Sequence, residues 1–589
     1  MISSCSSLQT LYTKKELEMA NQQLTIEKFF IGKILTIPEY QRSYSWERQN
    51  VRDLVEDINE SLETNSSHYI GTVVLAKTNI QDNYNIVDGQ QRLTTILMIM
   101  NVLILRLKDK EDTDYYKRLY IFDKNYEKYK ITPLSRDIEY FFALLNEEKN
   151  LIPKSRSQRY LTEVYEEIKN VVDEIIDNKK QFLRAVENLQ ILEFIEEDEG
   201  DAIRIFQTVN DRGKDLTRMD KMKSLLFYFS NKYLEKKYDH TINNTFGEIF
   251  ELYDNIKLIG EKQNINIIAS KQFNEDDILR YHHICFSNES YDPTVSQIMD
   301  NVKSKLMSFR KNKKLEELEL YIKVYLDSLL AFTKSFNNII NKSKTESKYY
   351  KIFTILGLSA VYYPVIIQLE RLGFLDTLLP TKDIKIIDML EIIDVRVLKI
   401  REYAGKKYIG KFSYKLNNED WDINKLEEYL LWFNSFEIDN NHFEYLLTNF
   451  SYYGNTGLLR LLFIDYSEKL NNRKYNINEL KDIMLTNPTI EHILSQTPKF
   501  DPVSYNFRDE DEFNEYKGII GNLTILEKGI NSSIQNKDLV EKVKGYDKSM
   551  FSITKKLSTK ISSTKVFNKE DLDERTKKLI IDFTKRWWA

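Results

Sequence analysis

Near its end the chain carries an acid, a histidine and two asparagines whose types and spacing suit hydrolysis of a phosphodiester. Glu491 and His492 stand together in one apolar run. Asn522 opens the next apolar run, and Asn531 follows it by nine residues. The reaction needs a base that deprotonates water and a divalent cation that neutralises the developing charge. The pattern therefore predicts a single-metal nuclease site of the ββα-metal type, a His-Asn-Asn variant of the HNH finger.

The residue types assign a role to each member of this set. His492 is the expected general base, because the reference pKa of histidine is close to neutral. Magnesium binds hard oxygen ligands and keeps several waters, so Glu491 and Asn531 suffice as protein ligands. Asn522 is expected to hold the connecting loop, as side-chain amides do by bonding local backbone. The competing interpretation is a structural histidine, which the adjacent acid and the two asparagines disfavour.

Basic residues accumulate after this set. From residue 528 to the end, 15 Lys and Arg stand against 8 Asp and Glu, in a chain whose net charge is -5. These lysines either follow a phosphate backbone or form a solvated helix face. The lysines concerned are Lys537, Lys542, Lys544, Lys548, Lys555, Lys556, Lys560 and Lys565.

A second constellation lies where an expected strand over 84–87 meets an expected helix over 93–107. A helix N-terminus attracts phosphate, and Gly89 there permits close backbone approach. Arg92 can form a fork on phosphate oxygens, and Gln90 and Gln91 can orient a water or a base edge. Asp88 can hold a metal through its waters or cap the helix. An ordinary capped helix remains the alternative.

Aromatic side chains cluster around an arginine in the segment 37–46. Arginine and aromatic faces can clamp a phosphate or a flipped base. The alternative is a turn, begun by Pro38, that aromatic core residues pack. The residues concerned are Tyr40, Gln41, Arg42, Tyr44 and Trp46.

Length and composition limit the classes of protein that fit. A chain of 589 residues is too long for one core. Its two cysteines, Cys5 and Cys285, exclude a disulfide framework and a cysteine-rich zinc site. No apolar run reaches the roughly 18 residues that span a bilayer, and no secretion signal is evident. A cytoplasmic protein is therefore expected.

The apolar patterns predict a mixed but mainly α chain in three parts. An α+β domain is expected over 1–230, a helical bundle over 231–480 and the ββα-metal domain over 481–589. A strand is expected over 69–75, a buried helix over 350–372 interrupted by Pro364, and a loop or hairpin over 398–420. The adjacent pair His282 and His283 is expected to be structural.

Taken together, the motifs resemble those of the GmrSD family of bacterial modification-dependent (type IV) restriction endonucleases. This family includes the phosphorothioate-sensing SspE branch. Ser495 departs from the pattern, because the family often has proline there. The motifs that carry the resemblance are Ile37–Trp46, Asp88–Thr95, Phe206–Thr217, Ile490–Gln496, Gly521–Leu526, Asn531–Ser533 and Asn536–Lys537.

The resemblance implies a function for each end of the chain. The N-terminal domain would be a ParB/sulfiredoxin-like fold that binds and hydrolyses a nucleoside triphosphate, with GTP favoured, and senses modified DNA through the aromatic segment. The C-terminal domain would cut or nick that DNA with magnesium or another divalent metal, using His492, Asn522 and Asn531. The implied nucleotide-binding residues are Asp88, Gly89, Gln90, Gln91, Arg92 and Thr94.

The leading hypothesis is therefore an antiphage endonuclease that is regulated by a nucleoside triphosphate. Its expected partners are modified double-stranded DNA and the nucleotide, without a membrane, and a homodimer is left open. The DNA modification is glucosylated hydroxymethylcytosine or a phosphorothioate backbone. Two alternatives remain: a nucleotide-gated ParB-like DNA clamp with an inactive nuclease, and a toxin-like ribonuclease.

Overall fold

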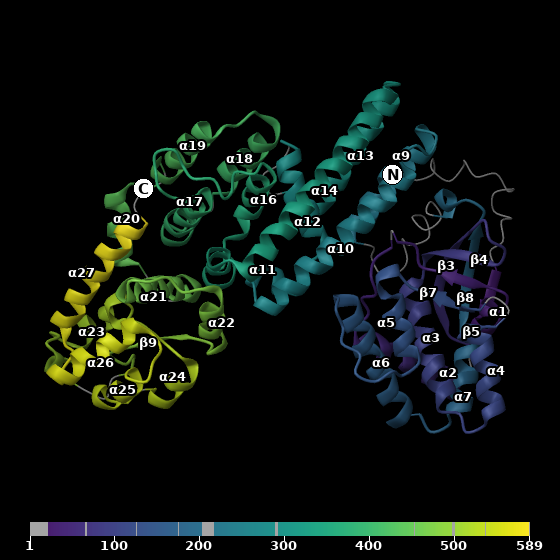
Figure 1. The fold of residues 1–589 in the computed structure, drawn as a ribbon, viewed down its shortest axis with the longest axis horizontal. Helices are drawn as coiled ribbons and strands as arrows, with labels where there is room; N and C mark the ends of the chain where they lie inside the picture. The colour runs from purple at the N-terminus through teal and green to yellow at the C-terminus, as the bar shows by residue number, and fades with distance from the viewer. Residues whose placement is uncertain are drawn as a thin grey trace, which may run out of the picture. The chain divides into compact units, whose positions relative to one another are not determined.

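The computed structural model describes most of the chain, in two compact units. The described residues are 22–39, 41–64, 67–124, 127–174, 176–202, 217–288, 293–403, 405–436, 438–450, 452, 454–497, 501–535 and 537–587. One unit comprises residues up to 258 with 295–330, and the other comprises 259–294 with 331 onwards. Helices predominate, and an α/β region lies near the start of the chain, as the sequence predicts (Figure 1). The finer division at 230 and 480 stays a prediction.

A mixed six-stranded sheet forms the centre of the first unit, in the order β1-β8-β3-β4-β2-β7. The central strand β3 runs parallel to β8 and antiparallel to β4. A separate pair is formed by β5 and β6. The strands are β1(Gln22–Thr25), β2(Ile34–Thr36), β3(Tyr69–Lys77), β4(Asn83–Asp88), β5(Phe122–Asp123), β6(Lys128–Tyr129), β7(Ile131–Thr132) and β8(Gln190–Glu196).

The helix α3(Gln90–Leu105) is the core helix of this unit, and nearly all its side chains are buried. An apolar surface all round a helix requires partners on every side. Figure 1 shows α2, α3, α4 and α7 together along the sheet, and α3 also contacts α6. The other helices are α1(Ile26–Phe30), α2(Arg48–Thr64), α4(Lys110–Tyr120), η1(Ser135–Asp137), α5(Ile138–Leu145), α6(Arg156–Glu174), α7(Lys179–Glu187), α9(Arg218–Tyr233) and α13(Val295–Lys311).

Helices form almost all of the second unit, and α10(Asp239–Gln263) and α14(Leu315–Thr345) extend across the division between the units. The first helices of the second unit are α11(Asn266–Ala269), α12(Glu275–Phe286), α15(Ser347–Tyr350), η3(Lys351–Leu356), η4(Ala360–Tyr362), α16(Tyr363–Arg371), α17(Ile386–Ile393), η5(Asp394–Ile400) and α18(Lys406–Asn418). The remaining elements are α19(Ile423–Phe436), α20(Asn440–Asn449), α21(Thr456–Asn471), α22(Ile477–Leu485), β9(Thr489–His492), η6(Pro502–Tyr505), α23(Glu510–Tyr516), η7(Ile520–Asn522), β10(Leu523–Leu526), α24(Lys528–Ile534), α25(Leu539–Tyr546), α26(Ser552–Thr564) and α27(Lys569–Arg586).

Two expectations for this unit need correction. The expected loop or hairpin over 398–420 is wrong, because η5 is a π-helix and α18 is a regular helix with a buried apolar face. The expected single helix over 350–372 breaks at Gly357, whose φ of 68° ends the π-helix η3. Pro364 instead lies in the first turn of α16, where a missing N–H costs no hydrogen bond.

A buried arginine holds the end of the described chain to the helical part of this unit. Arg396 donates to the carbonyl oxygen of Trp587 at 2.9 Å and to that of Ile438 at 3.0 Å. Its guanidinium also lies 4.4 Å from the ring centroid of Phe443. The last helix, α27, is therefore fastened at its C-terminus by a charge that has no access to water.

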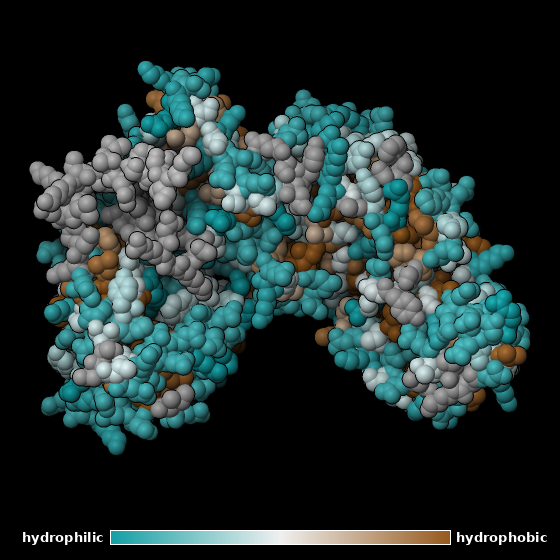
Figure 2. All heavy atoms as spheres, turned by 180° about the vertical axis from the view of Figure 1, so that it is seen from behind, coloured by the Kyte–Doolittle hydropathy of each residue, from teal (hydrophilic) through white to brown (hydrophobic). Residues whose placement is uncertain are grey.

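On the face shown in Figure 2, the coloured surface is mostly hydrophilic, and apolar side chains appear as separate patches among polar ones. Among the described residues, no helix has the length and apolar character that crossing a bilayer requires.

His283 on α12 gives a stability prediction that depends on pH. Burial lowers its pKa from 6.5 to about 4, so the folded chain holds it neutral. Below pH 6.5 the unfolded chain gains a proton that the folded chain excludes, and stability falls as pH drops towards 4. Between pH 7 and pH 5 this histidine should lower the free energy of unfolding by about 2 kcal/mol.

The measurement is urea unfolding, followed by circular dichroism, at pH 7 and pH 5. His283→Leu should reduce the pH-dependent loss by about that amount, whereas His442→Leu, at an exposed position on α20, should not. If the free energy of unfolding differs between pH 7 and pH 5 by the same amount in His283→Leu and in the parent protein, the assignment is wrong.

Candidate active site

The strands β9 and β10, together with α24, carry three of the predicted site residues, Glu491, His492 and Asn531. The strands are antiparallel, with His492 opposite Leu523 and Glu491 opposite Thr524. After β10, a single residue precedes α24, which carries Asn531. The Asn531 amide nitrogen donates to the Thr489 hydroxyl at 2.8 Å, so the helix is fastened to the start of the hairpin.

Asn522, between the two strands, organises the segment that follows His492. Its side-chain oxygen accepts from the backbone N–H of Leu494 at 2.8 Å, and its amide nitrogen donates to the carbonyl of Leu494 at 3.1 Å. The same nitrogen donates to the carbonyl of Lys517 at 3.1 Å. Its own carbonyl accepts from the N–H of Ile493. Asn522 is fully buried, so these bonds have no competition from water.

A partly buried arginine on α27 fixes the entry to β10. One guanidinium nitrogen of Arg575 donates to the carbonyls of Gly521 at 2.7 Å and Leu523 at 2.8 Å. A Cβ on Gly521 would lie 2.0 Å from the hydroxyl of Thr576 on the same helix. Glycine at this position therefore allows α27 to approach the strand, which explains its place in the motif.

Glu491 lies in an ion pair that the sequence does not predict. The ammonium of Lys542 on α25 donates to its Oε1 at 2.6 Å, and the hydroxyl of Tyr546 donates to the same atom at 3.5 Å. Burial raises the pKa of Glu491, and the nearby Lys542 acts in the opposite direction. Lys542 is only 1% exposed, so neither alternative for it, contact with a phosphate backbone or a solvated helix face, holds.

The other basic residues after the hairpin divide into two groups. Lys560 pairs with Asp571 and Glu574, which leaves it unsuited to binding phosphate. Of the eight lysines singled out in the sequence, six are exposed and form no ion pair within the described part of the chain: Lys537, Lys544, Lys548, Lys555, Lys556 and Lys565.

His492 is partly buried at the end of β9 and is held as a neutral imidazole. Burial, and secondly the charge of Lys542, lower its pKa from 6.5 to about 4. Its Nε2 lies 3.1 Å from the side-chain nitrogen of Gln496. At physiological pH the imidazole is therefore neutral and has a lone pair that can accept a proton, although the lowered pKa makes it a weaker base than an ordinary histidine.

The donor atoms suit magnesium better than zinc. Side chains alternate along a strand, so Thr489 and Glu491 share the face of β9 that meets α24 and α25. Among the described residues, no cluster of three or more His, Cys, Asp or Glu side chains forms a metal cage. A carboxylate of Glu491 and the amide oxygen of Asn531 would give two hard ligands, and magnesium accepts waters for the rest.

In the first unit, the two N-terminal motifs contact each other directly. Gln41 donates to the carbonyl of Val87 at 2.9 Å, and Gln90 donates to the side chain of Gln41 at 3.3 Å. Gln91 donates to the carbonyl of Ser43 at 3.1 Å. Segment 41–45 therefore lies against the N-terminus of α3, which begins after Gly89 in a left-handed conformation.

Arg92 binds the protein backbone in this structure. Its Nη1 donates to the carbonyl of Ile70 at 2.6 Å, and its Nη2 donates to that of Thr72 at 2.8 Å. Its guanidinium also lies 3.6 Å from the carboxylate of Asp88. Gly71 admits the guanidinium, because a Cβ there would lie 1.9 Å from Nη1. Both terminal nitrogens of Arg92, which the sequence assigned to phosphate, are therefore bound to β3.

The aromatic segment is packed more tightly than a DNA clamp would be. The Tyr44 hydroxyl lies 2.7 Å from that of Thr95, and burial raises the pKa of Tyr44. Trp46 packs against the core of the first unit. Arg42 pairs with Asp220 at 3.4 Å, near the start of α9. Tyr40, residues 206–216 of the third motif and Asn536 lie outside the described residues.

A small cavity lies where the two N-terminal motifs meet. Its volume is about 20 Å³, and its lining includes Arg42, Tyr44, Gln90, Gln91 and Thr94. Sites for small ligands usually measure several hundred Å³. A cavity of this volume is too small for a nucleotide.

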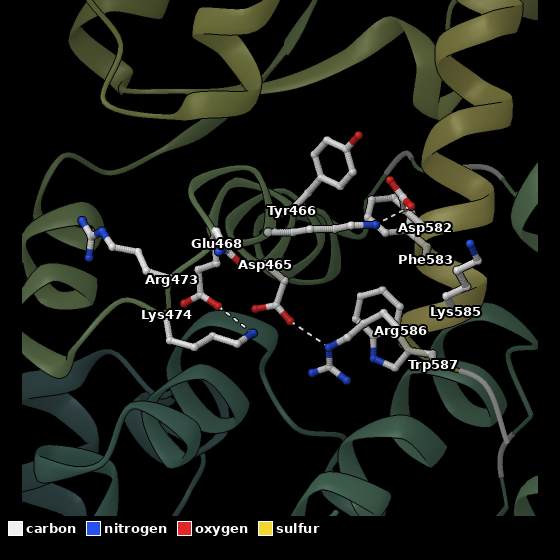
Figure 3. Close-up of a pocket in the computed structure, with 12 residues that line it drawn as sticks. Asp465, Tyr466, Glu468, Arg473, Lys474, Asp582, Phe583, Lys585, Arg586 and Trp587 are labelled. Carbon is white, nitrogen blue, oxygen red and sulfur yellow. Dashed lines mark hydrogen bonds and ion pairs between the residues drawn. The ribbon is translucent and has the colours of Figure 1, made fainter.

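A larger cavity of about 500 Å³ lies between α21 and α27 (Figure 3). Its acids are paired within the protein: Asp465 lies 3.2 Å from Arg586, and Glu468 lies 3.0 Å from Lys474. Lys469 likewise pairs with Asp582. The three acids that line the cavity are therefore paired within the protein, and the cavity contains none of the predicted site residues.

Comparison with known families matches both ends of the chain. The family model described as the N-terminal domain of the GmrSD restriction endonuclease matches residues 25–227. The model for the C-terminal domain of these endonucleases matches residues 437–581, which include the whole β9–β10–α24 region. No curated protein matches the chain.

Arg92 gives a prediction that separates a structural role from a nucleotide contact. Arg92→Met should destabilise β3 by about 2 kcal/mol, because it removes two hydrogen bonds from a charged donor. Hydrogen–deuterium exchange should then rise over residues 69–77. Arg118→Met, on the exposed side of α4, should leave that exchange unchanged. Unaltered exchange in Arg92→Met would show that the backbone contacts are unimportant.

Proposed function

Because the chain belongs to the GmrSD restriction endonuclease family, we propose that it cleaves modified DNA at the β9–β10–α24 site. The observation that carries the proposal is the bonding of the Asn522 side chain. Its amide oxygen and its amide nitrogen both bond the backbone of Leu494, two residues after His492. Glu491 and the neutral His492 are consecutive residues of the strand whose end this bonding holds, and Asn531 is fastened to the same hairpin. An HNH-like domain of the ββα-metal type accounts for all of these contacts.

In this proposal each side chain has one task. His492 accepts a proton from the attacking water, which its depressed pKa permits at neutral pH. Glu491 and Asn531 hold a divalent cation, for which magnesium fits best, and Asn522 keeps the histidine end of β9 in place. When bound, the cation supplies positive charge that stabilises the pentavalent phosphate and the leaving oxygen.

His492→Ala tests the site directly. The variant should cleave modified DNA at least about 100-fold more slowly, because general-base catalysis contributes that much or more. Chelation of divalent metal by EDTA should abolish cleavage by the parent protein. His442→Ala, at an exposed position on α20, is the matched control and should cleave normally. Cleavage by His492→Ala at the normal rate would refute the assignment.

The substrate panel separates the competing functions. Unmodified, hydroxymethylated, glucosylated and phosphorothioate DNA, together with total RNA, should be compared with the same protein preparation. We propose cleavage of glucosylated or phosphorothioate DNA. Cleavage of RNA alone would indicate a toxin-like ribonuclease, and nucleotide-dependent DNA binding without nicking would indicate a ParB-like clamp.

We further propose that the first unit, as a ParB/sulfiredoxin-like domain, binds and hydrolyses a nucleoside triphosphate, with GTP favoured, and so regulates cleavage. The convergence of the N-terminal motifs on the start of α3 supports this. The cavity there is small, and Gln41 and Gln91 hold segment 41–45 over it. Nucleotide entry therefore requires that segment to move, which couples nucleotide binding to the expected DNA-sensing residues.

Gln91→Ala tests this coupling. Removal of the bonds to Ser43 and Ser45 frees segment 41–45 and removes a predicted nucleotide contact. GTP binding, measured by calorimetry, should weaken about tenfold, because the predicted nucleotide contact of one or two hydrogen bonds, each contributing about 1 kcal/mol, is lost. Gln49→Ala, an exposed glutamine at the start of α2, should bind GTP normally. Identical GTP affinity in parent and Gln91→Ala proteins would exclude Gln91 from the site.

A further inference from the structure

The ammonium of Lys542 occupies a position that the proposed reaction does not require. It lies 2.6 Å from the Glu491 carboxylate, 2.6 Å from the carbonyl of His492 and 3.4 Å from that of Ile493. An ammonium has three N–H donors, and three oxygen atoms surround this one. All three belong to consecutive residues of the segment that carries the proposed base and metal ligand.

The surroundings of Lys542 fix this arrangement. Tyr546, one helical turn further along α25, is fully buried and donates to the same carboxylate oxygen. A Cβ on Gly545 would lie 2.7 Å from Ile534 of α24, so the two helices pack closely. One helix, α25, therefore supports both Glu491 and the helix that carries Asn531.

A buried lysine would be unfavourable here without a compensating role. Burial of an ammonium costs several kcal/mol unless oxygen partners replace its water. An apolar residue at 542 would avoid this cost, but it would leave the Glu491 carboxylate and two carbonyls without their partner. The lysine therefore fixes the acidic end of β9 in one position.

We propose that Lys542 is a positioning residue that shares Glu491 with the catalytic cation. This inference rests on the proposed nuclease function. Its ammonium fixes the carboxylate and the backbone of His492. Because two cations that share one carboxylate repel each other, it also keeps the affinity of the DNA-free site for a divalent metal low. The negative phosphate of bound DNA then offsets that repulsion, so metal is retained when substrate is present.

Lys542→Met separates this role from simple structural support. The DNA-free variant should bind Mn²⁺ about tenfold more tightly, because a positive charge beside Glu491 is lost. Its kcat for DNA cleavage should fall at least about tenfold, because the carboxylate and the strand end lose their fixed position. Loss of structure alone would weaken metal binding and cleavage together, so tighter binding with slower turnover is the distinguishing result.

The Mn²⁺ affinity is measured by electron paramagnetic resonance on the full chain without DNA. Lys407→Met, at an exposed lysine on α18 that lies outside the proposed site, should match the parent protein in both measurements. Lys542→Gln keeps a hydrogen-bond donor without the charge and should also bind Mn²⁺ more tightly, so it replaces the methionine variant if that fails to fold. Unchanged or weaker Mn²⁺ binding in a folded variant would overturn the proposal, as would failure of both variants to fold.

One further variant separates this proposal from the proposed function. Glu491→Gln should abolish Mn²⁺ binding if Glu491 is a metal ligand at all. If Glu491→Gln and the parent protein bind Mn²⁺ equally, the nuclease assignment itself fails. If Glu491→Gln loses Mn²⁺ and Lys542→Met matches the parent protein, only the role of Lys542 is wrong.

Discussion

Cationic side chains that bind backbone carbonyl oxygens hold the functional segments of this chain in place. Arg92 clamps β3 beside the start of α3, Arg575 fixes the entry to β10, and Lys542 fixes the end of β9. Arg396 does the same for the end of α27. A buried charge must be surrounded by such partners, and its removal leaves carbonyls unpaired as well as a space. Each segment is therefore tied to one geometry rather than packed loosely by apolar contacts.

This interaction also explains what the sequence could predict and what it could not. The two strands and the asparagines of the C-terminal site follow from local patterns, because apolar alternation and a side-chain amide act within a few residues. The ion pair of Lys542 and Glu491 does not, because the lysine lies on the helix α25, 51 positions after the strand residue Glu491. In a run of lysines, nothing local marks the one that is buried. The sequence predicts the same environment for Lys542 and the neighbouring lysines, whereas the structure buries Lys542.

The N-terminal site shows the same limit in a different form. The strand, glycine turn and helix at 84–105 were predictable, because the change from strand to helix periodicity coincides with Gly89. The strand β8 was not, since its acids Glu193 and Glu196 stand three residues apart, as in the helical pattern before it, and only its pairing with β1 and β3 identifies it. Arg92 looked free for phosphate because its partners, the carbonyls of Ile70 and Thr72, are backbone groups that no sequence pattern displays.

Within the second unit, α21 links the proposed catalytic hairpin to the helical region. Its residues contact β9, β10 and α26, and its buried acids Asp465 and Glu468 both pair with Lys351 of the π-helix η3. Asp465 also pairs with Arg586 of α27. Two buried carboxylates and two cations cannot slide past one another without breaking an ion pair in a low dielectric, so small displacements are strongly opposed. A movement of η3 or α27 would therefore carry α21 with it, and α21 would carry the strand that holds His492.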